Sequence, residues 1–216
     1  MTDFQFAKAF RSGVAALRKD LLVEGGQIST VRNYNFAILP YPPDDEFQLR
    51  GEIESLSGEL RDSGWWVAGI QLHSLLINRI EAQEARFIET MIAREKRLIR
   101  ASDPGRGLRD LKEKVANLIE GENGIAKDVI QEVSRILAKS DRGPARTVVF
   151  LSRAGALYPF MRTSALLKHL TGQTQNAPVV LLYPGTVDPD GGLSFMGVLP
   201  SDRDYRPRIY GMTRPE

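Results

Sequence analysis

The amino-acid sequence predicts an α/β protein in which helices cover both faces of a mostly parallel sheet. Four short segments are almost continuously apolar, and amphipathic helical patterns separate them. Strands that are apolar along their whole length are typical of a parallel sheet buried between two helical layers. The segments are YNFAIL (34–39), WWVAGIQL (65–72), TVVFL (147–151) and PVVLLY (178–183). With 216 residues, of which 42% are hydrophobic and 26% charged, the chain also has the size and composition of one globular domain.

The first half of the chain predicts a helix followed by a strand-helix-strand unit. Apolar residues spaced by three and four positions indicate helices over residues 5–23 and from Asp44 to Gly64. Three prolines, at positions 40, 42 and 43, end the strand between these helices. The segment 65–72 is rich in aromatic and β-branched residues, so it predicts the second strand of the unit. Such a unit is right-handed and parallel in nearly all proteins.

The second half predicts three helices and then a second strand-helix-strand unit. The helical patterns cover residues 73–100, 108–118 and 125–137. In the second unit, a helix at 157–170 joins the strands 147–151 and 178–183, and Pro184-Gly185 ends the last of these strands. Closing strands are expected at 193–199 and 208–210, with a loop or hairpin turn at GTVDPDGG. We therefore expect one domain over residues 1–216, with residues 73–140 as a helical segment between the two units.

The charge of the chain is unevenly distributed, although the net charge is only +2. Residues 142–187 contain no Asp or Glu, and their basic residues are Arg142, Arg146, Arg153, Arg162 and Lys168. One interpretation is a surface for phosphate, DNA or an acidic protein, because clustered positive charge attracts anions. The other is a strand-rich core segment whose arginines pair with acids elsewhere. The sequence leaves both open.

Several kinds of catalytic site are missing from the sequence. The absence of cysteine excludes thiol nucleophiles, disulfides and iron–sulfur clusters. No window matches the phosphate-binding GxxxxGK[ST] or the dinucleotide-binding GxGxxG pattern. The two histidines, His73 and His169, lie in or beside predicted helices, and Ser152 lacks the GxSxG pattern of a serine hydrolase. The sequence therefore predicts no catalytic residues, no cofactor and no metal site.

The candidate binding residues follow the strands of the second unit. Open α/β sheets bind ligands at the carboxyl ends of their strands, where this chain has LSRAGALYPFMR and YPGTVDPDGG. These segments offer arginine and tyrosine without a titratable base, which favours binding over bond-breaking. Tyr158 and Tyr183 could equally be core aromatics. The candidates for partner or nucleic-acid binding are Arg153, Tyr158, Arg162, Tyr183, Arg206 and Arg208.

Five segments of the sequence together form a recognisable pattern: FAILPY (36–41), LYPFMR (157–162), PVVLLYPG (178–185), LSFMG (193–197) and Tyr205-Arg206. In these segments the sequence resembles the BrxB family of bacteriophage-exclusion (BREX) defence systems. The resemblance implies a cytoplasmic, non-catalytic component of a system that methylates host DNA and blocks phage replication. It implies three partners: a PglZ-like phosphatase-family protein, an adenine methyltransferase and a large ATPase. It also implies a sheet related to nucleotide-binding α/β folds without the Walker A loop.

Three hypotheses about function remain open at this point. The first is a scaffold or adaptor that docks the PglZ-like protein. The second is a nucleic-acid-binding accessory protein that uses the acid-free stretch 142–187. The third is an unrecognised enzyme or nucleotide binder that uses the loops 152–158 and 184–192. The apolar runs are too short for a membrane helix and the first residues lack the apolar core of a signal peptide, so we expect a cytoplasmic location without membrane contact.

Overall fold

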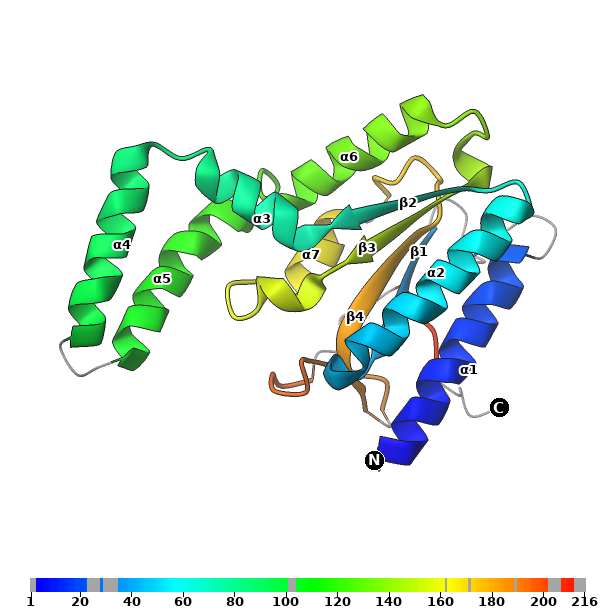
Figure 1. Ribbon diagram of the computed structural model, residues 1–216, viewed down its shortest axis with the longest axis horizontal. Coiled ribbons are helices and arrows are strands. Elements are labelled where there is room, and N and C mark those ends of the chain that lie inside the picture. Colours follow the sequence, from blue (N-terminus) through cyan, green and yellow to red (C-terminus); the bar gives the residue numbers. More distant parts are fainter. Residues whose placement is uncertain are drawn as a thin grey trace.

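A mostly parallel sheet, with six strands in the described part of the chain, organises the protein, and the predicted fold class is confirmed (Figure 1). The computed structural model describes residues 3–22, 28, 35–100, 104–161, 163–170, 172–188, 190–201 and 207–211. The strand order is β2-β3-β4-β1-β6, all parallel, and β5 pairs antiparallel with the end of β4. The strands are β1 (Phe36–Tyr41), β2 (Trp66–Gln71), β3 (Thr147–Ser152), β4 (Val179–Val187), β5 (Leu193–Phe195) and β6 (Arg208–Ile209).

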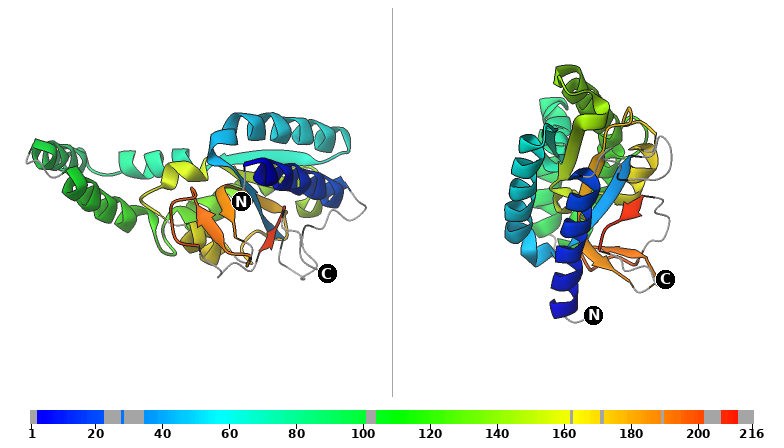
Figure 2. Two further views of the ribbon diagram at one scale, coloured as in Figure 1. Left: turned by 90° about the horizontal axis from the view of Figure 1, so that it is seen from below. Right: turned by 90° about the vertical axis from the view of Figure 1, so that its right-hand side faces the viewer.

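Helices cover both faces of the sheet (Figure 2). Helices α1 (Asp3–Leu22) and α2 (Glu46–Asp62) lie on one face. The other face is covered by α3 (Leu72–Glu81), α6 (Ile125–Lys139), α7 (Thr163–Leu170) and the last turns of α5 (Pro104–Ile119). Within the described part of the chain, no helix combines the length and apolarity needed to cross a membrane.

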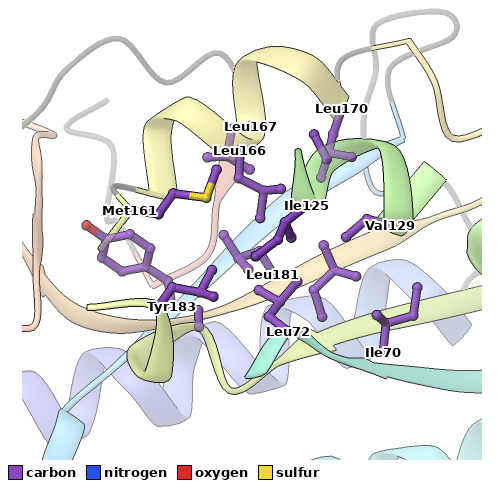
Figure 3. Close-up of a cluster of buried hydrophobic side chains, with 14 of the residues drawn as sticks. Ile70, Leu72, Ile125, Val129, Met161, Leu166, Leu167, Leu170, Leu181 and Tyr183 are labelled. Atoms are coloured by element: carbon purple, nitrogen blue, oxygen red, sulfur yellow. The ribbon is translucent and has the colours of Figure 1, made fainter. Parts of the chain in front are cut away.

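Alternation along the central strands divides the core into two clusters. In β1, Ile38 faces the α6–α7 side, and its neighbours Ala37 and Leu39 face α1 and α2. In β4, Leu181 and Leu182 divide in the same way. Figure 3 shows Leu181 among the side chains that α6 and α7 contribute to the first cluster. Because both faces of these strands are buried, their sequences are apolar throughout, which is the pattern that predicted the sheet.

The long helix expected from residue 73 to 100 is in fact two helices. Helix α3 ends at Glu81, and α4 (Ala85–Arg100) begins after a three-residue break. The side chain of Gln83 donates a hydrogen bond of 3.0 Å to the Arg79 carbonyl in the last turn of α3, and its backbone N–H bonds to Ile80. These bonds satisfy carbonyls that a continuing helix would have used. The break lets α4 turn away from the sheet.

The second strand-helix-strand unit also differs in detail from the expectation. The helix expected from residue 157 begins only at Thr163, because a residue before proline disfavours the helical conformation and Tyr158 is extended at ψ 137°. The strand β4 does not stop at Pro184-Gly185 but continues to Val187 in a hairpin with β5. Gly185 permits this hairpin, since a Cβ there would lie 2.2 Å from the Ser194 carbonyl oxygen. The expected strand 193–199 is three residues long. The first three residues of GTVDPDGG lie in β4, and the Asp188 N–H bonds to the Gly192 carbonyl at 2.8 Å, which fits the interpretation of this segment as a hairpin turn.

The short strand β6 is fastened to both the sheet and α1. The backbone N–H of Tyr210 bonds to the Ile38 carbonyl at 2.9 Å, and its hydroxyl donates to Asp20 at 2.8 Å. Arg208 forms an ion pair of 2.6 Å with the same carboxylate and lies 4.7 Å from the centre of the Tyr210 ring. Burial and the hydrogen bond to Asp20 raise the pKa of the Tyr210 hydroxyl above its ordinary value. Tyr210 is therefore protonated in the folded protein at pH values where a free tyrosine ionises.

This raised pKa predicts a loss of stability at alkaline pH. Below about pH 10, tyrosine is protonated in both the folded and unfolded chains, so Tyr210 adds no pH dependence. Above it, the unfolded chain releases the proton and the folded chain keeps it, so the free energy of unfolding falls by about 1.4 kcal/mol per pH unit for this group. We expect Tyr210→Phe to have a shallower fall in urea-unfolding midpoint between pH 9 and 11 than the parent protein. Parallel curves for the two proteins would contradict the assignment.

Candidate functional site

The segment between β1 and α2 occupies the place where many nucleotide-binding α/β proteins hold phosphate. β1 lies inside the sheet, and its carboxyl end leads through a short 3-10 helix (Pro43–Asp45) to the first residue of α2. Phosphate-binding proteins have a glycine-rich loop at such a strand-to-helix junction, with backbone N–H groups and a lysine turned to the anion. This chain has PPDDE at positions 42–46 instead. These three consecutive acids repel phosphate, and the positive end of the helix dipole stabilises their negative charges.

Glu46, the first residue of α2, has three side-chain partners at this junction. Tyr41 donates its hydroxyl to one carboxylate oxygen at 2.5 Å, and Arg50 donates to the other at 3.3 Å. The Arg153 guanidinium lies 3.8 Å from that second oxygen. Burial, together with the hydrogen bond to Glu46, raises the pKa of the Tyr41 hydroxyl. The carboxylate thus stands at the helix N-terminus with two arginines beside it, an arrangement that a bound anion would otherwise complete.

Arg153 lies at the carboxyl edge of the sheet, where the sequence placed it. It follows β3 directly and adopts the left-handed conformation, with φ 62° and ψ 30°. This turn aims its side chain across the sheet edge toward α2, where it remains 41% exposed. Sequence reasoning did not identify Glu46 or Tyr41. The acid at the first helical position was visible, but its contact with Arg153 depends on which strands are neighbours.

A groove with a volume of about 500 Å³ begins at this cluster and runs between α2 and β2. We call it the α2–β2 groove. Its wall comes from one side of α2, from Glu46 to Arg61. Its floor comes from β2 and from Phe150 and Leu182 of the neighbouring strands, and Arg153 closes one end.

The two candidate tyrosines lie on the opposite face of the sheet from this groove. Tyr183 is completely buried in the core cluster next to α7. Its ring centre lies 5.4 Å from that of Phe195, and Tyr158, partly buried, lies 6.3 Å from the same ring. The structure therefore brings the two tyrosines together around Phe195 but separates them from Arg153. The interpretation of Tyr183 as a core aromatic fits its burial.

The candidate arginines do not form one surface among the residues the structure describes. Arg208 pairs with Asp20 near the end of α1, and Arg18 of that helix pairs with Glu59 near the end of α2 at 3.0 Å. Arg153 contacts the first residue of α2, thirteen residues earlier in the helix, or about 20 Å away at 1.5 Å per residue. Arg162 and Arg206 lie outside the described residues.

Other basic residues of the acid-free stretch have partners within the protein. Arg142 forms an ion pair of 3.3 Å with its neighbour Asp141. The Arg146 guanidinium lies 5.4 Å from the centre of the Trp65 ring, within the range of a cation–π contact. The Arg142–Asp141 pair agrees with the interpretation in which the arginines of a core segment pair with acids elsewhere, whereas the contact described for Arg146 is with an aromatic ring.

Helices α4 and α5 form an arm that projects beyond the sheet (Figure 1 and Figure 2). Arg94 and Asp110 join the two helices by an ion pair of 2.6 Å, and Gly107 allows a close approach, since a Cβ there would lie 3.0 Å from the Glu95 carboxylate. We call this pair the α4–α5 arm. The sequence predicted α5 as a helix and α4 as the second part of one helix over 73–100, but not their projection from the sheet.

Arg79 of α3 anchors the base of the arm. Its guanidinium donates to the carbonyls of Leu118 at 2.9 Å, Asn123 at 2.6 Å and Gly124 at 2.7 Å, and it forms an ion pair with Asp128 of α6. A planar guanidinium with five donors is suited to holding several acceptors at once. One side chain thus connects α3, the end of α5 and the start of α6, so the arm leaves the body from a fixed position.

The surface of the arm is basic and partly apolar. The two helices contain nine Arg or Lys residues and four Asp or Glu residues, a difference of +5. Ile92 and Ile99 are 49% and 55% exposed, and Leu108 of α5 is 48% exposed. Ile92 and Ile99 are seven residues apart, so they lie on one stripe of α4. Across the described residues, no group of three or more His, Cys, Asp or Glu side chains is placed to hold a metal ion.

Comparison with known proteins places the chain in a family. The sequence model for BREX protein BrxB matches residues 68–209, which is more than half of the chain and includes the arm. The chain is also 24% identical, over 174 residues, to BREX protein BrxB of Bacillus cereus (strain H3081.97). This alignment covers 79% of the chain and 80% of the relative. No solved structure matches. The resemblance noted in the sequence is confirmed: the chain belongs to the BrxB family of BREX phage-defence proteins.

Proposed function

We propose that this BrxB protein is a non-catalytic adaptor in the cytoplasm, which docks a PglZ-like partner and so supports host DNA methylation and phage exclusion. Membership of the family implies a role in BREX phage defence, where several proteins act together. The observation that carries the adaptor proposal is the α4–α5 arm, which presents half-exposed isoleucines on a fixed, projecting element. The partner itself comes from the resemblance to the family.

The physical properties of the arm suit protein docking. Fully burying an exposed isoleucine side chain contributes about 1.5–3 kcal/mol. Ile92 and Ile99 are already half-buried, so covering the rest of each would contribute about half of that to a binding free energy. The excess positive charge would speed association with an acidic surface. Because Arg79 already holds the base of the arm, docking loses little conformational freedom there.

The junction after β1 supports a non-catalytic role. A nucleotide at this place would have to displace the Glu46 carboxylate from Tyr41 and Arg50 and meet Asp44 and Asp45. The nearby Ser152 hydroxyl contacts the Ile70 carbonyl at 3.5 Å, and no histidine base lines the groove around it. The local chemistry therefore favours an internal ion pair over phosphate binding.

Nucleic-acid binding is a second candidate, and the charge of the arm is the observation that favours it. The earlier hypothesis used the stretch 142–187, but Arg153 and Arg208 are separated and each faces a carboxylate. The α4–α5 arm has the larger concentration of basic residues, with Arg97 and Arg100 in the last turn of α4. Binding to DNA through these residues would weaken steeply with salt, whereas apolar docking would not.

The adaptor proposal predicts that the double substitution Ile92→Glu and Ile99→Glu abolishes docking. Both side chains are half-exposed, so the thermal midpoint should stay within a few degrees of the parent, while affinity for the purified PglZ-like protein falls at least tenfold. Val198→Glu, at a 68% exposed position outside the arm, is the matched control and should bind normally.

Binding measurements at two salt concentrations separate the two candidate functions. We expect the PglZ-like protein to bind at both 50 and 300 mM salt and duplex DNA to show no comparable binding. Equal affinity of the double variant and the parent for the PglZ-like protein would refute docking through the arm. Salt-sensitive capture of DNA, lost in Arg97→Glu with Arg100→Glu, would favour the second candidate.

The junction after β1 generates a separate prediction about Glu46. Removal of its carboxylate leaves Tyr41 without an acceptor and two arginines without their partner, so Glu46→Ala should cost about 1–3 kcal/mol in free energy of unfolding. Glu54→Ala, two turns further along α2, should cost much less. Addition of Mg²⁺ and ATP should not shift the thermal midpoint of the parent protein. A clear upward shift would contradict the non-catalytic proposal.

A further inference from the structure

The α2–β2 groove lies beside a sheet edge that no strand covers in the part of the chain the structure describes. β2 is the outermost strand and pairs only with β3 on its inner side. Trp66, Gly69 and Gln71 of this six-residue strand are exposed, in contrast to β1, where every residue is buried. The outer backbone groups of β2 are therefore available to another chain.

β2 also lacks the features that usually protect an edge strand. Natural edges carry lysines, prolines, bulges or inward-facing charges that prevent pairing with other chains. The strand Trp66–Gln71 reads WVAGIQ, without a charge or a proline, and pairs with β3 in an unbroken register. An unprotected edge of six residues extends about 20 Å, long enough for a stable strand pairing.

Gly69 gives the groove its depth at the middle of β2. Strand alternation turns Val67, Gly69 and Gln71 toward the α2 side, and all three line the groove. A Cβ built on Gly69 would meet only the Phe150 carbonyl oxygen, at 3.9 Å, so the space above it is open. Glycine inside a strand often marks a place where another backbone approaches closely.

The chemistry of the walls indicates what kind of segment the groove accepts. Its floor at β2 is small or polar, which offers little to the apolar face of a helix but leaves room beside an extended backbone. Arg50, Arg61 and Arg153 line it, against Glu46 and Glu54. Three arginines against two glutamates leave the lining with a net charge of +1, so the complementary charge for a ligand is negative.

We propose that the α2–β2 groove binds an extended, acidic segment of a partner protein, which adds as a strand to the outer edge of β2. Its backbone pairs with β2, and alternate side chains enter the groove over Gly69, with carboxylates toward the arginines of α2 and toward Arg153. The site is separate from the α4–α5 arm and does not depend on the adaptor proposal. The groove is thus a second binding surface. It takes an extended segment, whereas the α4–α5 arm docks the surface of a folded protein.

The test uses a phage-displayed library of twelve-residue peptides, panned on the full-length protein. We expect the selected peptides to alternate apolar and acidic residues. A synthetic peptide from the selection should slow amide hydrogen exchange in residues 66–71. Gly69→Val fills the floor of the groove with a residue that strands favour, and the 3.9 Å clearance allows it to fold. It should reduce peptide affinity at least tenfold without lowering the thermal midpoint.

Two controls separate this site from other effects. Gly51→Ala, on the exposed side of α2 where a Cβ meets nothing within 4 Å, should bind the peptide like the parent. The Ile92→Glu, Ile99→Glu variant should also bind it normally, so a failure of arm docking does not affect this result. Failure to enrich any peptide, equal affinity for Gly69→Val, or exchange protection confined to other elements would each overturn the proposal.

Discussion

Burial of the central strands on both faces is the constraint on which the rest of the structure depends. β1, β3 and β4 are apolar on both sides, so each side needs a helical layer to remove it from water. The chain supplies α1 and α2 to one side and α6 and α7 to the other. The alignment of Ile38, Leu181 and Leu151 across the three strands places their side chains in one cluster. On the α2 side, β2 contributes Gly69, above which the α2–β2 groove stays open.

Electrostatics at the end of β1 follows from the same architecture. In a parallel sheet, the carboxyl end of an interior strand leads to a helix N-terminus, where the helix dipole favours a negative charge. Nucleotide-binding proteins leave that place for phosphate, whereas this chain places its own Glu46 there and brings Arg153 from the end of β3. An internal carboxylate stabilises the junction without a ligand. Because Glu46 stands where a phosphate would bind, the local chemistry supports the proposed binding role better than a nucleotide-dependent role.

The sequence predicted those features that arise from local pattern. The strands could be predicted because burial on both faces requires continuous apolar runs in β1, β3 and β4. The end of α2 was also predicted, from Gly64. The late start of α7 could also have been predicted, because Pro159 excludes a helical Tyr158.

Features that depend on distant contacts could not be predicted in this way. The break after α3 falls in Ala82-Gln83-Glu84, three residues without glycine or proline, so propensity gives no signal. Arg79 holds α3 against the α5–α6 junction, and this contact exists only in the folded chain. The same limit applies to the candidate site. Arg153 was placed correctly at a strand end, but its partner Glu46 and its distance from Arg208 follow from strand order and helix length.

The two proposed surfaces are connected by one short helix. Helix α3 begins at Leu72, directly after the last residue of β2, and Arg79 then fixes the end of that helix at the base of the arm. A partner that contacts the arm would therefore hold its nearby chain at a high local concentration around β2. In that situation a weak strand pairing becomes effective without further contacts, because the second binding event is intramolecular. For the proposed adaptor, this connection through α3 sets the relative position of the two bound elements.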